Sequence, residues 1–269
     1  MPLTWPPRTD EVAPYARLAP AYDHLMRHVN YARWATYLVG LFGLASGAVR
    51  SVLDVSCGTG SLLIELANAG YDVLGFDRSW GMVAQARRKL AARRLGGQTP
   101  ATPLDRLSSA RLWCGDMHAF ALRHPVDATL CIYDSMNYCD DLGGVARVVS
   151  QAADAVRPGG LFVFDVCTEH NCRVHFADYY EQDAVAEFSY RRRAYYDPRQ
   201  RLQINEIDIV DERQPAVFRE VHRQRIFAIA DLQRLCDGPP WELLGCFAGF
   251  TRRPGDEQSD RVHFALRRR

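Results

Sequence analysis

The chain has 269 residues, of which 48% are apolar and 24% are charged. These are the proportions of a folded core, so they exclude a disordered or fibrous chain, and the length suits one large α/β domain or one domain with an insertion. The 33 Lys and Arg residues nearly balance the 32 Asp and Glu residues, which leaves a formal net charge of +1. The charge therefore excludes a global positive field that would gather nucleic acid or an anionic membrane.

The first residues and the cysteines indicate the compartment. Residues 1–12 (MPLTWPPRTDEV) lack the basic cap and apolar stretch of a secretory signal. The most apolar early stretch, Tyr37 to Val49, has roughly 13 residues, whereas a membrane span needs ~20. The eight cysteines contain no CxxC pair and no zinc-finger spacing. We expect buried thiols in a reducing cytoplasm, no membrane span and no metal.

Apolar periodicity predicts two helices near the N-terminus, at 14–29 and 33–44. Short apolar runs then alternate with helices, which predicts a doubly wound, mostly parallel, seven-stranded Rossmann-like α/β sheet with helices on both faces. The expected strands are 49–55, 72–76, 110–114, 127–133 and 161–166, the expected helices are 61–69, 79–95 and 142–156, and a surface loop is expected at 96–109.

After the fifth strand the pattern changes. Polar and apolar residues alternate from 187 to 227, which predicts an antiparallel β insertion, followed by a helix at 228–236 and strands at 242–247 and 261–266. Alternate strand residues face opposite sides, so Arg191, Arg192 and Arg193 cannot form one patch, and we expect them on a solvated or interface face. The expected parts are an N-terminal helical cover at 1–46, a core at 47–174 and 226–269, and the insertion at 175–225, serving as a lid or a dimer contact.

The run LDVSCGTG, residues 53–60, ends the first expected strand and opens a helix, at the sheet edge where open α/β sheets bind ligands. Its glycines permit a tight turn and close approach of a ligand. Asp77 ends the second strand 19 residues after Gly58 and is placed to accept both hydroxyls of a ribose. Asp54 would repel a pyrophosphate and attract a cation, and Leu63 stands where a dinucleotide fingerprint needs a small residue. These residues favour a cationic ribonucleoside over a nicotinamide dinucleotide.

The same run resembles the first motif of the class I S-adenosyl-L-methionine-dependent methyltransferases, usually LDxGCGTG, with Ser56 where glycine is more common. FDRSWGM at 76–82, GDM at 115–117, YDSMNY at 133–138 and RPGG at 157–160 follow at matching places. Ala21-Tyr22-Asp23 is similar to the N-terminal cover of the small-molecule branch, which includes glycine N-methyltransferase and amino-sugar N-methyltransferases. The resemblance implies methyl transfer from S-adenosyl-L-methionine by in-line displacement, with S-adenosyl-L-homocysteine as product.

The resemblance also implies roles for individual residues. Asp77 would hold the ribose diol, Asp116 would accept the adenine amino group, and an aromatic side chain, Tyr22 first, would reach the cofactor tail. Aromatic faces attract a sulfonium cation. The full set of expected cofactor contacts is Tyr22, Tyr31, Trp34, Asp54, Ser56, Cys57, Gly58, Gly60, Asp77, Arg78, Met82, Asp116, Met117 and Tyr133.

A nitrogen or oxygen acceptor must lose a proton to free the lone pair that attacks the methyl group, which favours a base held nearby. Tyr138, after the fourth strand, is the first candidate for the catalytic role, His28 the second and His222 the third, with Asn137 and Asp134 as alternative polar contacts. The expected partner is a small-molecule methyl acceptor, with a homodimer through the insertion as a further possibility. The sequence leaves the acceptor open. Two other interpretations are a catalytically silent adenosyl-methionine-binding scaffold or regulatory partner, and a nicotinamide-dependent reductase, which Leu63 and Asp54 disfavour.

Overall fold

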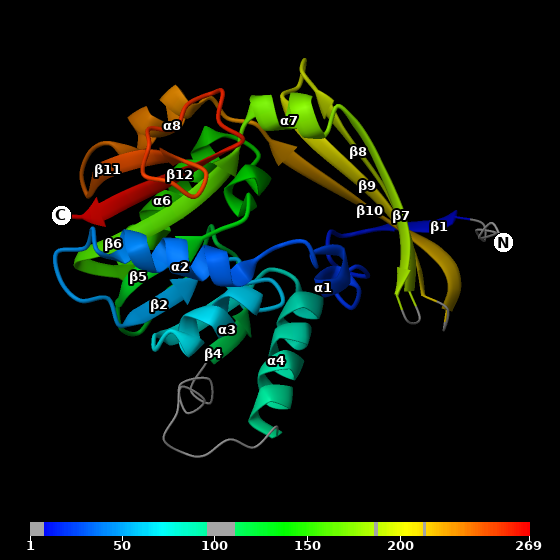
Figure 1. Cartoon of the computed structure of the whole chain (residues 1–269), viewed down its shortest axis with the longest axis horizontal. Helices are drawn as coiled ribbons and strands as arrows, with labels where there is room; N and C mark the ends of the chain where they lie inside the picture. The colour runs from blue at the N-terminus through cyan, green and yellow to red at the C-terminus, as the bar shows by residue number, and fades with distance from the viewer. Residues whose placement is uncertain (1–7, 96–110, 186–187, 212–213) are drawn as a thin grey trace.

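The computed structural model describes residues 8–95, 111–185, 188–211 and 214–269, and these residues form two β-sheets with flanking helices (Figure 1). One sheet has seven strands in the order β11-β12-β6-β5-β2-β3-β4, and the other has five in the order β1-β10-β9-β8-β7. The loop expected at 96–109 lies outside the described residues.

The first sheet confirms the predicted seven-stranded, mostly parallel arrangement. Its strands are β2 (Ser51–Asp54), β3 (Asp72–Asp77), β4 (Arg111–Cys114), β5 (Val126–Cys131), β6 (Val156–Cys167), β11 (Trp241–Ala248) and β12 (Arg261–Arg268). The strands β2 to β6 are parallel to their neighbours, whereas β12 is antiparallel to β6 and β11 is antiparallel to β12. The strand β6 begins earlier than predicted, because the chain passes from helix to strand at Val156 without a loop.

Helices cover both faces of this sheet, as its strands require when both faces are apolar. On one face α2 (Tyr31–Phe42), α3 (Ser61–Asn68) and α4 (Trp80–Leu95) pack with Val52 and Leu130. On the other face α6 (Leu142–Ala155) and α8 (Ile229–Cys236) pack with Leu53 and Phe164. None of the helices in the described part of the chain is long and apolar enough to cross a membrane.

The N-terminal segment differs from the helix predicted at 14–29. Only α1 (Tyr22–Leu25) is helical there, the preceding residues form turns, and β1 (Arg8–Val12) pairs in parallel with a strand of the second sheet. Pro14 and Pro20 explain the difference, since proline lacks an N–H and restricts the residue before it. The second predicted helix is confirmed as α2.

The second sheet contains the predicted antiparallel insertion. Its strands are β7 (Asp178–Val185), β8 (Phe188–Asp197), β9 (Leu202–Asp211) and β10 (Gln214–Arg225), and α7 (Glu169–His175) leads into it. The alternation of polar and apolar residues that predicted the insertion begins at residue 187, so it did not predict β7. Apolar residues of this sheet, such as Tyr190 and Ile209, pack on Leu18 and Leu25. The N-terminal segment therefore joins the two sheets (Figure 1).

Candidate active site

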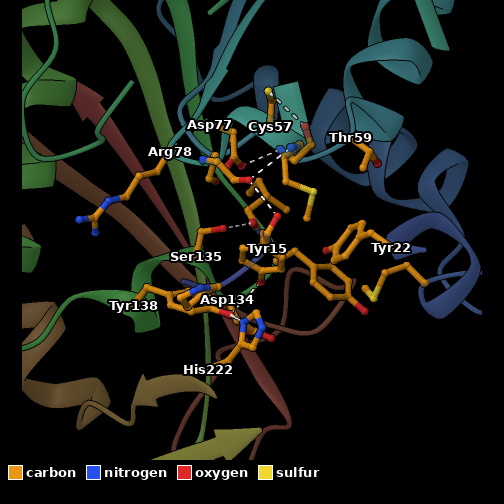
Figure 2. A pocket seen from close by; sticks show the side chains of 18 of the residues that line it. Tyr15, Tyr22, Cys57, Thr59, Asp77, Arg78, Asp134, Ser135, Tyr138 and His222 are labelled. Carbon is orange, nitrogen blue, oxygen red and sulfur yellow. Dashed lines mark hydrogen bonds between the residues drawn. The ribbon is translucent and has the colours of Figure 1, made fainter. Parts of the chain in front are cut away.

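A cavity of about 990 Å³ lies at the carboxyl edge of the parallel strands, and both sheets and the N-terminal segment line it. Figure 2 shows Asp77 and Cys57 at one end, Tyr138 and His222 at the other, and Tyr15 and Tyr22 between them. We call the first the cofactor end and the second the acceptor end. The predicted site residues that line the cavity are Tyr22, His28, Tyr31, Trp34, Asp54, Ser56, Cys57, Gly58, Asp77, Arg78, Met82, Asp116, Met117, Tyr133, Asp134, Tyr138 and His222.

Gly60 is the predicted cofactor contact that does not line the cavity. Both glycines of the turn after β2 have positive φ, 53° at Gly58 and 76° at Gly60, where an L side chain would be strained. A Cβ on Gly60 would lie 3.1 Å from the Cβ of Ala86, whereas one on Gly58 would meet nothing within 4 Å. Gly60 therefore shapes the turn and lets α4 approach it, and Gly58 leaves space on the cavity side.

Asp77 is braced by the backbone of two loops. One of its carboxylate oxygens accepts a hydrogen bond from Gly58 N at 2.9 Å, and the other accepts one from Ser79 N at 2.8 Å. Burial raises the pKa of Asp77, and these two hydrogen bonds counteract it. Each oxygen keeps a further lone pair, so the fixed carboxylate can accept two neighbouring hydroxyls.

Asp54 is a carboxylate in an apolar setting. Only 3% of it is exposed, and it accepts a hydrogen bond from Ser56 N at 3.0 Å. Burial raises its pKa to about 7, and the nearby charge of Asp77 adds to the effect. Within the described ranges no Lys, Arg or His forms a salt bridge with it. A cationic ligand would supply the missing charge.

Asp116 follows β4 and has a partner that the sequence did not suggest. It accepts a hydrogen bond from His118 N at 2.9 Å, and the same oxygen lies 2.8 Å from His118 Nδ1. Burial opposes the charge of Asp116, but the contacts with His118 outweigh it and lower its pKa. Asp116 is therefore fixed as a hydrogen-bond acceptor at the cavity wall, which the buried Met82 also lines.

Aromatic rings form the remaining wall of the cofactor end. Tyr22 meets Tyr15 edge to face with ring centroids 5.7 Å apart, and the rings of Trp34 and Tyr133 are 5.6 Å apart. Burial raises the pKa of Tyr133 to about 12 and raises that of Tyr31 further, so both hydroxyls are neutral. Neutral aromatic rings can attract a cation while excluding water.

At the acceptor end, Tyr138 belongs to a chain of four hydrogen-bonded side chains. Its hydroxyl lies 2.7 Å from the hydroxyl of Tyr15 and 2.8 Å from His222 Nδ1, and His222 Nε2 lies 3.1 Å from Glu220. Tyr15 and Glu220 were missed by sequence reasoning, since one fell inside a predicted helix and the other read as a polar position of a strand. His28 lines the cavity on its exposed side and is not part of this chain.

Two of the predicted polar contacts at this end have structural roles instead. Asn137 is fully buried and does not line the cavity, because its amide bonds to Cys167 N at 3.0 Å and to Arg225 O at 2.7 Å. Asp134 lines the cavity but is held in a two-point ion pair with Arg261, at 2.6 and 2.9 Å. These contacts fix the 3-10 turn η1 (Ser135–Tyr138), which carries Tyr138.

The arginine run on β8 alternates as predicted, but its middle member does not face solvent. Arg192 lines the cavity and donates two hydrogen bonds to Asn205 Oδ1, at 2.9 and 2.6 Å. Arg191 pairs with Asp208 and Arg193 with Asp178. The expectation of a solvated face is therefore wrong for Arg192, because the insertion folds over the cavity. Within the described ranges, no group of three or more His, Cys, Asp or Glu residues could hold a metal ion.

The fold is that of a class I methyltransferase, and its seven-stranded sheet places a glycine turn and carboxylates at one edge. Residues 52–160 match the family model described as a methyltransferase domain. A putative methyltransferase of Bacillus subtilis, YqeM, is 25% identical over 93% of this chain and 95% of its own length. A dTDP-3-amino-3,4,6-trideoxy-alpha-D-glucopyranose N,N-dimethyltransferase of Streptomyces venezuelae is 28% identical over 55% of this chain and 56% of its own.

A solved structure shares the fold over nearly the whole chain. It is an S-adenosylmethionine-dependent methyltransferase from Clostridium acetobutylicum, with a TM-score of 0.73 and 20% identity over 93% of this chain and 97% of that one. Residues 52–160 are thus a methyltransferase domain, and the chain shares the fold of an S-adenosylmethionine-dependent methyltransferase.

Proposed function

We propose that the protein transfers a methyl group from S-adenosyl-methionine to the amine nitrogen of a small molecule held between the two sheets. The observation that carries this proposal is the single cavity with two unlike ends, one with fixed carboxylates and aromatic rings and the other with a hydrogen-bonded chain of Tyr, His and Glu side chains. The similarity to a sugar N,N-dimethyltransferase supports nitrogen as the methylated atom.

The residues of the cofactor end fit S-adenosyl-methionine. Asp77 offers two fixed acceptors for the ribose hydroxyls, Asp116 offers one for the adenine amino group, and Asp54 lacks a cation of its own. The rings of Tyr22, Tyr31, Trp34 and Tyr133 complete the wall around the methionine part. When bound, this cofactor supplies a methyl group activated by a positively charged sulfur.

The chain contributes orientation and exclusion of water. The backbone-braced Asp77 fixes one reactant, and Arg192, Gln203 and Asn205 on the inner face of the five-stranded sheet offer hydrogen bonds to the other. Fixing both reactants in line can contribute several kcal/mol, about 7 or more, to lowering the barrier. The N-terminal segment covers the point where the two ends meet, which keeps water from competing as a nucleophile.

The experiment is a turnover assay with a panel of primary and secondary amines, each matched by the alcohol of the same skeleton. Formation of S-adenosyl-homocysteine and of the methylated acceptor is followed by mass spectrometry. We expect turnover with amines and none with the matched alcohols. Turnover with alcohols alone would contradict nitrogen as the target, and tight binding of S-adenosyl-homocysteine without any turnover would favour a silent binding scaffold.

We further propose that the protein acts in the cytoplasm and that the insertion at 175–225 serves mainly as a roof over the acceptor end. The inward-facing Arg192, Asn205 and His222 support this role. We also propose that residues 1–46 form an N-terminal cover and that residues 47–174 and 226–269 form the cofactor-binding core. A homodimer through the insertion would be a second role, and light scattering on the purified protein would detect it as a doubled mass.

A further inference from the structure

We propose that Tyr15, Tyr138, His222 and Glu220 form a proton wire that takes a proton from the acceptor's ammonium group and stores it on His222. The inference rests on the proposed amine acceptor. Tyr15 is the catalytic residue that meets the acceptor, and the other three are positioning and relay residues. The direction of the wire follows from the hydrogen bonds alone.

Glu220 sets the direction because its oxygens only accept. It is fully buried, and its Oε1 accepts from Arg17 N at 2.6 Å and from Leu18 N at 2.9 Å. Its Oε2 accepts from Tyr15 N at 2.6 Å and lies 3.1 Å from His222 Nε2. Three backbone N–H groups donate to this carboxylate and favour its charged form, whose oxygens only accept, so we assign the proton of His222 to Nε2, the donor of this contact.

This contact fixes the tautomer of the imidazole. A neutral His222 with its proton on Nε2 has a lone pair on Nδ1, which must accept from the Tyr138 hydroxyl at 2.8 Å. The oxygen of Tyr138 then accepts from the Tyr15 hydroxyl at 2.7 Å. The oxygen of Tyr15 is left with a lone pair, and Tyr15 lines the cavity. The open end of the wire is therefore an acceptor on the cavity side.

The surroundings favour passage of a proton through Tyr138 and storage on His222. Burial raises the pKa of Tyr138 beyond its ordinary value, so its hydroxyl passes a proton without resting as phenolate. His222 is 3% exposed, and Glu220 on its own strand contacts Nε2 at 3.1 Å, on the far side of the ring from the Nδ1 that receives the proton. The other groups that face His222 or its partner are Tyr15 from the N-terminal segment, Tyr138 from η1, Asn205 opposite on β9, and Arg192 from β8, whose charge acts on Tyr138.

An ammonium proton of the acceptor moves to the Tyr15 oxygen, the Tyr15 proton moves to the Tyr138 oxygen, and the Tyr138 proton moves to His222 Nδ1. The neutral amine then forms the new N–C bond with its freed lone pair, while the electrons of the broken C–S bond remain on sulfur. The proton on His222 returns to solvent through the same groups after the products leave.

The first test needs no acceptor. Long-range ¹H–¹⁵N spectra of the full chain with S-adenosyl-homocysteine report which nitrogen of His222 carries the proton, and the His222→Gln variant assigns its signals. We expect the Nε2–H tautomer, shifting to Nδ1–H in Glu220→Gln, whose amide can donate to Nε2. The Nδ1–H tautomer in the wild type would overturn the wire.

The second test compares two amines of the same skeleton from the active panel. One is an aliphatic amine protonated at the assay pH, and the other is its trifluoroethyl analogue, which arrives neutral. We expect Tyr15→Phe and Glu220→Gln to lower kcat about 10²-fold for the protonated amine and less than about threefold for the neutral one, with little change in KM. The double variant should lose no more than the worse single variant, because the residues act as one unit.

Matched controls separate the wire from general damage. Tyr37→Phe removes another partly buried hydroxyl, which donates to Thr251 O, and Glu257→Gln alters another carboxylate that accepts from a backbone N–H, at Ile229. Both should leave kcat unchanged with either amine. Equal losses of kcat with both amines in Tyr15→Phe would overturn the proton wire. If the wild type methylated no amine at all, the proposed function would be contradicted, and the tautomer of His222 measured in the first test would still support or overturn the wire.

Discussion

The two ends of the cavity are built in different ways. At the cofactor end each carboxylate is held by backbone that lies close in sequence or on the neighbouring strand, as Asp54 is by Ser56 N and Asp77 by Ser79 N. At the acceptor end Tyr138, from the parallel sheet, depends on Tyr15 and on His222, which are 123 and 84 residues away. The cofactor end is therefore a property of one sheet edge, whereas the acceptor end exists only when three parts of the chain meet.

The largest effect should fall on the acceptor end, whose turn is held by a charged residue far away in the sequence. Arg261 pairs with Asp134 and with Asp165, which is fully buried. Arg261→Leu leaves both carboxylates without a cation, and we expect a loss of about 3 kcal/mol or more in the free energy of unfolding. Urea denaturation measures it. Arg261→Lys keeps the charge and should lose less, and an unchanged midpoint in Arg261→Leu would show that these ion pairs do not hold the acceptor end.

The next largest effect should fall on the cofactor end alone. Asp77→Ala removes the two acceptors proposed for the ribose, and we expect the Kd of S-adenosyl-homocysteine to rise about 100-fold by calorimetry. Asp154→Ala, an exposed carboxylate on α6, is the control and should bind as the wild type does. A Kd within threefold of the wild-type value would remove Asp77 from the cofactor site.

Asp54 and Asp116 should respond to pH with opposite signs. Burial raises the pKa of Asp54 to about 7, so the folded state holds a proton that the unfolded state releases, and this stabilisation is lost as pH rises from about 4 to about 7. Asp54→Asn should therefore be more stable than the wild type at pH 8, by about 2 kcal/mol, and nearly equal to it at pH 4. Thermal unfolding at both pH values measures this.

Asp116→Asn is the matched comparison. The contacts with His118 lower the pKa of Asp116, so its stabilisation is present at neutral pH and is lost in acid. The variant should be slightly less stable than the wild type at pH 8, with a small effect because the carboxylate is partly exposed. If both variants changed the free energy of unfolding in the same direction at pH 8, the environments assigned to Asp54 and Asp116 would be contradicted.

The smallest effect concerns the segment that spans both ends. Lys89 on α4 contacts Asp23 at 2.8 Å and Ser61 at 2.6 Å, and Thr59 donates to Asp23 at 2.5 Å, so the N-terminal segment is tied to the glycine turn. Lys89→Met should raise the dissociation rate of S-adenosyl-homocysteine about three- to fivefold, because a partly exposed ion pair contributes about 1 kcal/mol or less. Stopped-flow displacement measures it, and an unchanged rate would mean that this tie does not limit release.

The same contrast explains what could be predicted from the sequence. Strand ends of a parallel sheet meet at one edge whatever the details, so Asp54, Asp77 and Asp116 could be placed from the pattern of strands. Tyr15 could not be placed, because its position depends on turns set by Pro14 and on the backbone contacts of Glu220. Arg192 was expected on a solvated or interface face, because strand alternation gives two faces but does not say which of them will face the cavity.

The turn before Tyr138 has a consequence for how the chain can be divided. Tyr133 and Asp134 have φ values of 66° and 62°, a conformation that costs non-glycine residues free energy. It is held by Asp165, which accepts from Tyr133 N at 2.6 Å, and by Arg261 on the last strand. A fragment that ends at residue 160 would contain every residue of the family match, but it would lose both Asp165 and Arg261. The methyltransferase domain recognised in the sequence is therefore not expected to be active as a separate fragment.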